Sequence, residues 1–165
     1  MILSAQTIRK LCNPPDFVDR GPLLDPFEER TRFGGVTFGL SSAGYDVRAE
    51  FDEDGIQYER VLESGRFMLA STIERFSMPN DIIGIVHDKS SWARRGLAVQ
   101  NTVIEPGWSG WLTLELTNHG SQELVIERGV GIAQVIFHKL DLTTDQPYEG
   151  KYQDQRRGPI DAKAK

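Results

Sequence analysis

Short runs of branched and aromatic residues, separated by turn-forming residues, make up most of the chain after residue 44. Runs of about four to eight such residues are typical of β-strands. The expected strands are 44–51, 57–62, 66–73, 82–87, 97–104, 110–118, 122–126 and 130–140. Many short strands at this spacing predict a mainly all-β protein, built as a barrel or a jelly roll.

Two turns between these strands have the composition of hairpin loops. Residues 52–55 (DEDG) and 118–121 (NHGS) each place helix-averse polar side chains next to a glycine. Such sequences favour tight turns between antiparallel strands. We therefore interpret both turns as hairpin loops.

The two ends of the chain depart from the β pattern. Ser4 can cap a helix, and Ile8 and Leu11 lie at helical spacing, so a short amphipathic helix is expected before Asn13. Prolines and glycines between residues 14 and 44 exclude long helices there and favour loop and short strand. Residues 141–165 are polar and lack apolar periodicity, which predicts a flexible C-terminal tail.

Length and charge narrow the function classes. The 165 residues carry 19 Lys and Arg against 24 Asp and Glu, a net charge of −5. This length predicts one domain over residues 1–165, and the acidic balance argues against broad nucleic-acid binding. Every apolar run is far shorter than the roughly 18 residues that span a membrane. No secretory signal is evident, so a cytoplasmic protein is expected.

Protein-bound metal is not expected either. The single cysteine, Cys12, excludes a disulfide within the chain and the paired cysteines of zinc-dependent deaminases. The three histidines, His87, His119 and His138, lack metal-binding spacing. The sequence therefore predicts no zinc site and no other dedicated metal site.

The first candidate for chemistry is the segment 87–96 (HDKSSWARRG). Ser90 or Ser91 is expected to be the N-cap of a one-turn helix that stops at Gly96. Free backbone N–H groups, two hydroxyls and Lys89 together suit a phosphate. The alternative is a capped surface turn with solvated basic side chains, which these residues alone favour.

A second candidate is Glu115, on a strand whose residues alternate strictly in polarity. One face is Leu112, Leu114 and Leu116, and the other is Trp111, Thr113, Glu115 and Thr117. If the second face lines a cleft, desolvation raises the pKa of Glu115 toward the range useful for moving protons at neutral pH. If that face meets solvent, Glu115 is ordinary surface, and periodicity alone favours this alternative.

Two further segments carry groups suited to a nucleotide. Glu105 and Trp108 bring a carboxylate and a ring to the start of the same strand, where Trp108 either packs against a sugar or simply fills the core. The tail offers a cation, hydroxyls and an amide in Tyr148, Lys151, Tyr152 and Gln155. These tail residues either order over a triphosphate or remain disordered, and the residues alone favour disorder.

Taken in order, several segments resemble the dCTP deaminase family, which shares its fold with the trimeric dUTPases. They are ILS at 2–4 with the helix after it, GLSSAGYDVR at 39–48, KSSWAR at 89–94, PGWSG at 106–110, LE at 114–115, RG at 128–129, IAQ at 132–134 and KYxxQ at 151–155. Each segment is a weak indication alone, and their common order is specific. The resemblance implies a distorted β-barrel assembled as a homotrimer, with active sites between neighbouring subunits.

The resemblance also implies an activity, the zinc-independent hydrolysis of dCTP to dUTP and ammonia. Glu115 would be the general acid and base, which takes a proton from the water attacking C4 of cytosine and delivers protons to N3 and the leaving amino group. Ser90 and Arg94 would hold the catalytic water and the network around it.

Substrate contacts follow from the same resemblance. The residues expected at the triphosphate are Lys89, Ser90 and Ser91, joined by Tyr148, Lys151 and Gln155 when the tail 141–165 closes. Glu105 would bind the deoxyribose 3′-hydroxyl, Trp108 would crowd out a 2′-hydroxyl, and Thr113 completes the expected substrate-binding set. Mg²⁺ would be bound through the triphosphate rather than by a protein cage.

The charge distribution agrees with a small polyanionic ligand. Residues 89–95 carry three basic side chains and no acidic one. Residues 151–165 carry five basic side chains against Asp154 and Asp161. The acidic total therefore conceals two basic patches, both at positions where the resemblance expects the triphosphate.

One segment departs from the family pattern. Between Val99 and Glu105 the chain is two residues shorter and lacks the Ala-His pair that borders the base in typical deaminases. Val103 replaces that pair only loosely. We hypothesise that the trimmed hairpin widens the pocket near C5 of the pyrimidine and admits 5-substituted cytosines.

Two rival functions stay open at this point. A dUTP diphosphatase, or a bifunctional enzyme that forms dUMP from dCTP, is supported by SAGYD at 42–46 and GIAQ at 131–134. A glutamate at position 105 in place of aspartate, and the lack of a glycine-rich C-terminal motif, oppose a pure diphosphatase. The other rival is a catalytically silent nucleotide-binding relative, against which the presence of Glu115 and Arg94 weighs.

Overall fold

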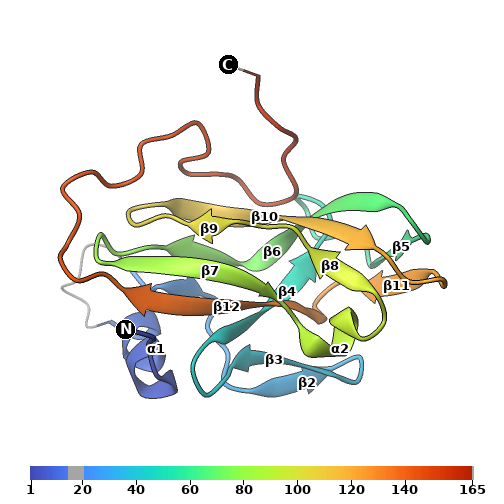
Figure 1. Cartoon of the computed structure of the whole chain (residues 1–165), viewed down its shortest axis with the longest axis horizontal. Helices are drawn as coiled ribbons and strands as arrows, with labels where there is room; N and C mark the ends of the chain where they lie inside the picture. Colours follow the sequence, from blue (N-terminus) through green and yellow to red (C-terminus); the bar gives the residue numbers. More distant parts are fainter. Residues whose placement is uncertain (15–20, 165) are drawn as a thin grey trace.

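A curled β-sheet, flanked by one helix, forms the body of the structure (Figure 1), a computed structural model that describes residues 1–14 and 21–164. The helices are α1 (Ala5–Cys12) and the single turn α2 (Ser90–Ala93). The strands are β1 (Leu24–Asp25), β2 (Thr31–Phe33), β3 (Val36–Leu40), β4 (Tyr45–Glu50), β5 (Glu59–Leu62), β6 (Phe67–Ser77), β7 (Ile82–Asp88), β8 (Leu97–Val99), β9 (Val103–Ile104), β10 (Ser109–Asn118), β11 (Leu124–Glu127) and β12 (Gly131–Lys139). The prediction of a mainly β fold with a short N-terminal helix is confirmed.

Strand pairing explains how the sheet curls. Its main path runs β8-β10-β6-β4-β12-β7-β9, with β1, β2 and β3 attached to its side, while β5 and β11 form a separate pair. The two ends of this path, β8 and β9, follow one another in sequence. Residues 100–102 therefore link the two edges of the curled sheet.

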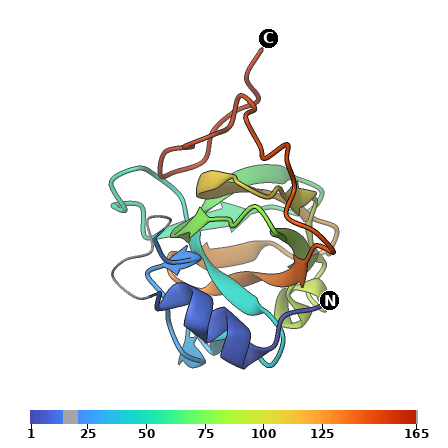
Figure 2. The same ribbon diagram turned by 90° about the vertical axis from the view of Figure 1, so that its left-hand side faces the viewer.

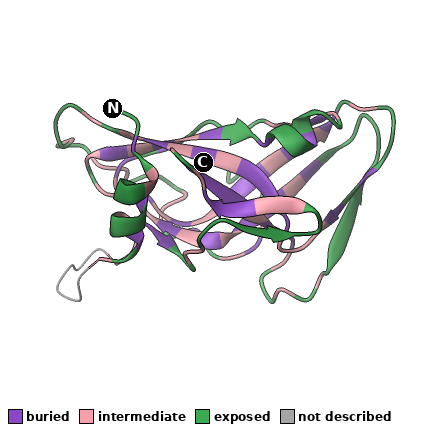
Figure 3. Ribbon diagram, turned by 90° about the horizontal axis from the view of Figure 1, so that it is seen from below, coloured by how far each residue is buried: buried purple, intermediate pink, exposed green. Residues whose placement is uncertain are grey.

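The core is supplied by alternate residues of these strands. On β12, Ala133, Val135 and Phe137 are fully buried, and the residues between them are partly exposed. Leu114 and Leu116 of β10 are also fully buried, as the alternation predicts. Each buried side chain of this size stabilises the fold by roughly 1.5–3 kcal/mol. In Figure 3 the buried residues follow the strands, whereas α1 is mostly exposed.

Both hairpin predictions are wrong. The turn at 52–55 joins β4 to β5, but β4 pairs with β3, β6 and β12, and β5 pairs with β11. The turn at 118–121 joins β10 to β11, but β10 pairs with β6 and β8. Local composition predicts the change of direction, whereas the sheet path decides which strands pair.

Two strand predictions also need correction. The expected strand 97–104 is two strands, β8 and β9, because residues 100–102 leave the sheet. The strict alternation along β10 is interrupted by a register shift between Trp111 and Thr113, opposite β6. As a result Leu112 lines the same pocket as Thr113 and Glu115 instead of lying on the opposite face.

The C-terminal tail contains no helix or longer strand among its described residues, 141–164, as the polar pattern predicts. It nevertheless contacts the barrel through one bridge between Gln155 and Gly110 and through several hydrogen bonds to β10. Figures 1 and 2 both show the tail on the side of the sheet opposite α1. No helix among the described residues is long and apolar enough to cross a membrane.

Candidate active site

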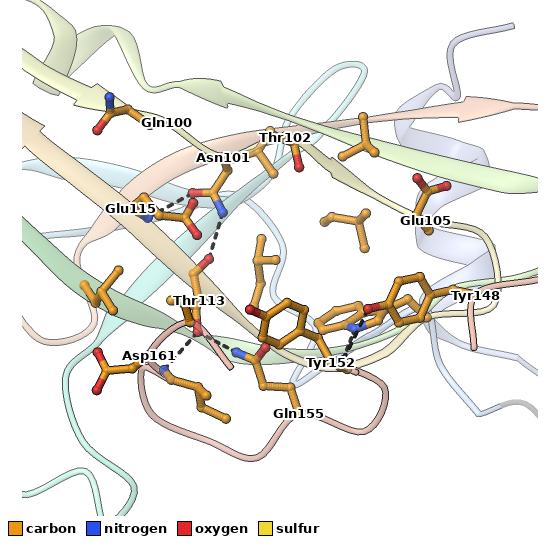
Figure 4. Close-up of a pocket in the computed structure, with 18 of the residues that line it drawn as sticks. Gln100, Asn101, Thr102, Glu105, Thr113, Glu115, Tyr148, Tyr152, Gln155 and Asp161 are labelled. Atoms are coloured by element: carbon orange, nitrogen blue, oxygen red, sulfur yellow. Dashed lines mark hydrogen bonds between the residues drawn. The ribbon is translucent and has the colours of Figure 1, made fainter. Parts of the chain in front are cut away.

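A cavity of about 690 Å³ lies between β10, the segment 100–105 and the tail (Figure 4). Its polar lining residues include Gln100, Asn101, Thr102, Glu105, Thr113, Glu115, Tyr148, Tyr152, Gln155 and Asp161. Its apolar walls include Phe67, Leu69, Val86, Val103, Ile104, Trp108 and Leu112. A volume of this order suits a small organic ligand.

Glu115 lies at one end of this cavity, beside Asn101, whereas Glu105 and Tyr148 lie toward the other end (Figure 4). The Glu115 side chain is half-buried, and its burial raises the pKa of its carboxyl above the ordinary value, opposed only by a hydrogen bond from its own backbone. Of the two sequence-based alternatives for this strand face, the structure therefore supports the cleft. A carboxyl with a raised pKa in a cleft is a candidate proton carrier.

The backbone of Glu115 is held by the neighbouring segment. The backbone N–H of Gln100 donates to the Glu115 carbonyl at 2.9 Å, and the Glu115 N–H donates to the Asn101 side-chain oxygen at 3.2 Å. The Asn101 amide group in turn donates to the Thr113 carbonyl at 2.7 Å. Sequence reasoning assigned no role to Asn101, although a carboxamide inside a predicted strand is an available signal.

Glu105 and Trp108 both line the cavity but differ in exposure. Glu105 is exposed, and its carbonyl accepts a hydrogen bond from the Trp108 backbone N–H. Trp108 is buried, packs 6.1 Å from the Phe76 ring centroid and donates from its indole to the Tyr152 carbonyl at 2.7 Å. Trp108 thus forms a wall of the cavity and also anchors the tail.

The tail closes one side of the cavity by binding Thr113. The buried Thr113 hydroxyl accepts hydrogen bonds from the Gln155 amide and from the Ile160 backbone N–H. Tyr148 also lines the cavity, and its hydroxyl accepts a hydrogen bond from the Tyr152 backbone. Lys151 is absent from the described lining and instead donates to the Lys163 carbonyl.

The segment around α2 differs from its prediction at the helix start. Lys89, not Ser90 or Ser91, is the N-cap, and it makes no side-chain cap hydrogen bond. The Lys89 ammonium is buried and bound to the Asp46 carboxylate, with a further hydrogen bond to Thr37. The serine hydroxyls do not cap the helix, because Ser90 and Ser91 are its first two residues. The helix also ends earlier than predicted, at Ala93 with Arg94 as its C-cap, and turn residues continue to Gly96, whose φ is 93°.

Ser90, Ser91 and Arg94 are all exposed, and none belongs to the described lining of the cavity. Within one chain, the α2 residues are thus not brought together with Glu115. Among the residues that the structure describes, no three His, Cys, Asp or Glu side chains gather closely enough to hold a metal ion.

Comparison with known proteins connects this geometry to a family. A family model described as dCTP deaminase-like matches residues 33–140. A dCTP deaminase of Campylobacter fetus subsp. fetus is 36% identical over 159 residues, which cover 81% of this chain and 86% of that relative. The chain belongs to the dCTP deaminase-like family. A dCTP deaminase of Psychrobacter cryohalolentis is 35% identical over 167 residues, covering 81% of this chain and 87% of the relative.

Solved structures of similar shape are dUTPases. The dUTPase of Staphylococcus aureus phage phi11 has a TM-score of 0.54 at 16% identity and covers 78% of this chain and 93% of the neighbour. The dUTPase of Staphylococcus bacteriophage 80alpha has a TM-score of 0.53 at 17% identity, with the same coverage of both chains. These likenesses show the fold alone and confirm the predicted dUTPase-like barrel.

This member of the dCTP deaminase-like family gathers part of its predicted site in one chain. The predicted residues that line the cavity are Glu105, Trp108, Thr113, Glu115, Tyr148 and Gln155. Those outside the described lining are Lys89, Ser90, Ser91, Arg94 and Lys151. Residues that only the structure brings to the cavity include Asn101, the tail residue Asp161 and the apolar side chains of β6 and β7, and those of β6 and β7 reach the cavity through strand pairing.

Proposed function

We propose that this protein catalyses the zinc-independent hydrolytic deamination of dCTP to dUTP and ammonia. One observation carries the proposal: Glu115 is a half-buried carboxyl with a raised pKa at the end of a cavity large enough for a nucleoside. Its support is the identity of about a third to relatives that are named dCTP deaminase. We further propose a cytoplasmic location, where a deoxynucleotide substrate would be met.

The proposed reaction moves protons through Glu115. The carboxylate takes a proton from a water molecule while the water oxygen bonds to C4 of cytosine, and the carboxyl then delivers this proton to N3. The carboxylate next takes the proton of the new C4 hydroxyl and delivers it to the amino group, which leaves as ammonia as the C4–N bond breaks and the C4 carbonyl of dUTP forms. A carboxyl with a raised pKa suits both steps, because it can accept and return a proton near neutral pH.

The exposed residues of α2 support a shared site in a homotrimer. Ser90 and Arg94 lie outside the cavity of their own chain and are free to face a neighbour. We propose that they complete the Glu115 cavity of an adjacent subunit, where they hold the catalytic water and the surrounding network. Ser91 would bind the triphosphate there. The buried Lys89 ammonium is already paired with Asp46, so Lys89 would contribute a backbone N–H to the phosphates.

The remaining contacts are assigned to the far end of the cavity and the tail. Glu105, exposed at that end, would bind the 3′-hydroxyl, and the Trp108 wall would exclude a 2′-hydroxyl. Thr113 and Gln155 would border the nucleotide through their mutual hydrogen bond. The tail residues Tyr148 and Lys151 would meet the triphosphate when the tail adjusts to it.

Magnesium would be bound through the triphosphate oxygens, where it neutralises charge on the phosphates. A variant of the phage phi11 dUTPase coordinates a structural Mg(II) ion, and its likeness to this chain extends to the fold alone. In this chain the Asp46 carboxylate is engaged by Lys89, so phosphate oxygens are the better ligands.

The base end of the cavity supports acceptance of 5-substituted dCTP. Phe67, Leu69, Val86 and Val103 give this cavity apolar walls, and Phe67 and Val103 are exposed enough to be reached. A methyl group at C5 would bury apolar surface there, worth about 0.8 kcal/mol. Turnover of 5-methyl-dCTP no faster than background, beside brisk turnover of dCTP, would refute this part of the proposal.

One incubation separates the proposed activity from its rivals. The protein is mixed with dCTP and Mg²⁺, and dUTP, dUMP, ammonia and pyrophosphate are resolved. Ammonia with dUTP is the expected result. Ammonia with dUMP and pyrophosphate indicates a bifunctional enzyme. Binding without any product indicates a silent relative. A parallel incubation with dUTP identifies a pure diphosphatase, which releases pyrophosphate from dUTP and no ammonia from dCTP.

A further inference from the structure

The short segment 100–102 occupies a special place in the sheet. It leaves β8 at one edge of the curled sheet and enters β9 at the other edge. On the way it lies along β10 beside Glu115, at the end of the cavity (Figure 4). Its conformation therefore affects both the closure of the sheet and the surroundings of Glu115.

The register between β8 and β10 shows what a continuing strand would do here. Val99 is opposite Leu116, so the next step places Gln100 opposite Glu115. In an antiparallel sheet every second pair of opposite residues exchanges two backbone hydrogen bonds, and Gln100 with Glu115 would be such a pair. The first is present, from the Gln100 N–H to the Glu115 carbonyl at 2.9 Å.

Beyond the end of β8, the Asn101 side chain makes the hydrogen bonds to β10 that a continuing strand would make. Its oxygen accepts the Glu115 N–H at 3.2 Å, in place of the Gln100 carbonyl. Its amide group donates to the Thr113 carbonyl at 2.7 Å, in place of a backbone N–H from the next strand residue. The carboxamide thus supplies the acceptor and the donor that two successive peptide groups of a continuing strand would present to β10.

The orientation of Glu115 depends on these hydrogen bonds with the Asn101 side chain. No side chain among residues 1–14 and 21–164 donates a hydrogen bond to its carboxylate, so the direction of the carboxylate follows from its backbone and the cavity walls. Both polar backbone groups of Glu115 are bound by Gln100 and Asn101. Misplacing a reacting group by about 1 Å can cost about 100-fold in rate.

We propose that Asn101 is a positioning residue that fixes the Glu115 carboxylate for proton transfer. This role rests on the proposed deamination. It deepens that proposal, because it gives a function to the segment 100–102, which lies in the part of the chain that is two residues shorter than the family pattern. The general requirement is a side chain with both an acceptor and a donor, which Asn provides and Asp and Ala do not.

Three variants test this role: Asn101→Ala, Asn101→Asp and the matched control Thr117→Val. The Thr117 hydroxyl donates to the Gln100 side chain of the same segment, and Thr117 lies outside the described cavity lining. Asn101→Ala should lower kcat for dCTP by roughly 10- to 100-fold while KM changes less than about threefold. Asn101→Asp keeps the acceptor but adds a negative charge, so the acid limb of the pH–rate profile should move to higher pH. Thr117→Val should retain the wild-type profile.

A readout without turnover keeps the test independent of the proposed function. The pKa of Glu115 is followed by carboxyl ¹³C NMR in the wild type and in each folded variant. A changed Glu115 titration in both Asn101 variants, with an unchanged Glu115 titration in Thr117→Val, supports the positioning role. A wild type that releases no ammonia would refute only the deaminase proposal. Wild-type kcat and an unchanged Glu115 titration in Asn101→Ala would overturn the role. If Asn101→Ala does not fold, the same two results in Asn101→Asp overturn it.

Discussion

Two glutamates on neighbouring parts of the sheet have opposite surroundings. Glu50, at the end of β4, is fully buried and accepts hydrogen bonds from Arg128, at 3.0 Å to each oxygen, and from the tail residue Arg157. Glu115, on β10, is half-buried and has no charged partner among the described residues. Of these two glutamates, Glu50 thus has two cationic partners and Glu115 has none among the described residues.

The contrast separates a structural carboxylate from one suited to catalysis. A buried carboxylate that accepts hydrogen bonds from two guanidinium groups links the segments that carry them. A carboxyl that loses water without gaining a cation has its pKa raised, which suits proton transfer. We therefore expect changes at Glu115 to affect activity and changes at Glu50 to affect stability.

The largest expected effect is the loss of activity in Glu115→Gln. The amide keeps the shape of the side chain but cannot accept and return a proton, so ammonia release from dCTP should fall by about 10²- to 10⁴-fold. Nucleotide binding, measured by calorimetry, should survive. Glu123→Gln, at an exposed position outside the described cavity lining, is the control and should keep wild-type activity. Substantial turnover by Glu115→Gln would contradict the assigned role.

The next effect is on stability, in Glu50→Gln. Removing one partner of a buried ion pair typically costs roughly 3–5 kcal/mol. The cost here should lie near the lower end, because Arg128 and Arg157 are about a third exposed and can recover some water. Urea unfolding measures the change in free energy. A stability equal to that of the wild type would show that this cluster does not hold the tail.

Two adjacent arginines in the tail sharpen the same comparison. Arg157→Gln removes one of the two cations on buried Glu50 and should cost about 1.5–3 kcal/mol, the range for hydrogen bonds to charged groups. Arg156→Gln removes an exposed pair with Glu53 and should cost about 0–1 kcal/mol. Limited proteolysis should cut the tail faster in the Arg157 variant only. Equal effects would argue against a specific tail contact at Glu50.

The smallest expected effect is a pH dependence of stability. Because the folded state raises the pKa of Glu115, it holds this proton more tightly than the unfolded chain does. Wild-type stability relative to Glu115→Gln should therefore fall as pH rises above about 4.3, the ordinary glutamate value, and level off above the raised pKa. Thermal unfolding from pH 4 to 8 measures the difference in Tm, and a difference that is constant with pH would refute it.

The chain sequence predicts the elements better than their pairing. The strands around β4, β7, β10 and β12 and the helix α1 follow from local periodicity; Ser4 is the N-cap of α1 but makes no side-chain cap hydrogen bond. The partners of β5 and β11 do not, since strand pairing depends on contacts between distant segments. The short strands β2 and β3 lie among the prolines and glycines of residues 14–44, where only loop and short strand were expected.

The candidate site was predictable to a similar extent. Glu115, Glu105 and Trp108 are close in sequence on or beside one strand, so a pattern can bring them together. Asn101 and Phe67 could not be assigned in this way, because the break between β8 and β9 and the pairing of β6 with β10 place them. The tail contact at Glu50 joins residues far apart in sequence, and no local signal predicts it.

The most direct test of the account compares the pH–rate profile of ammonia release from dCTP with the NMR titration of the Glu115 carboxyl in the same wild-type protein. The account predicts a Glu115 pKa clearly above about 4.3 and an acid limb of kcat/KM at that same pKa, absent in Glu115→Gln. A Glu115 that titrates at its ordinary value, or a rate that ignores its titration, would contradict the central claim.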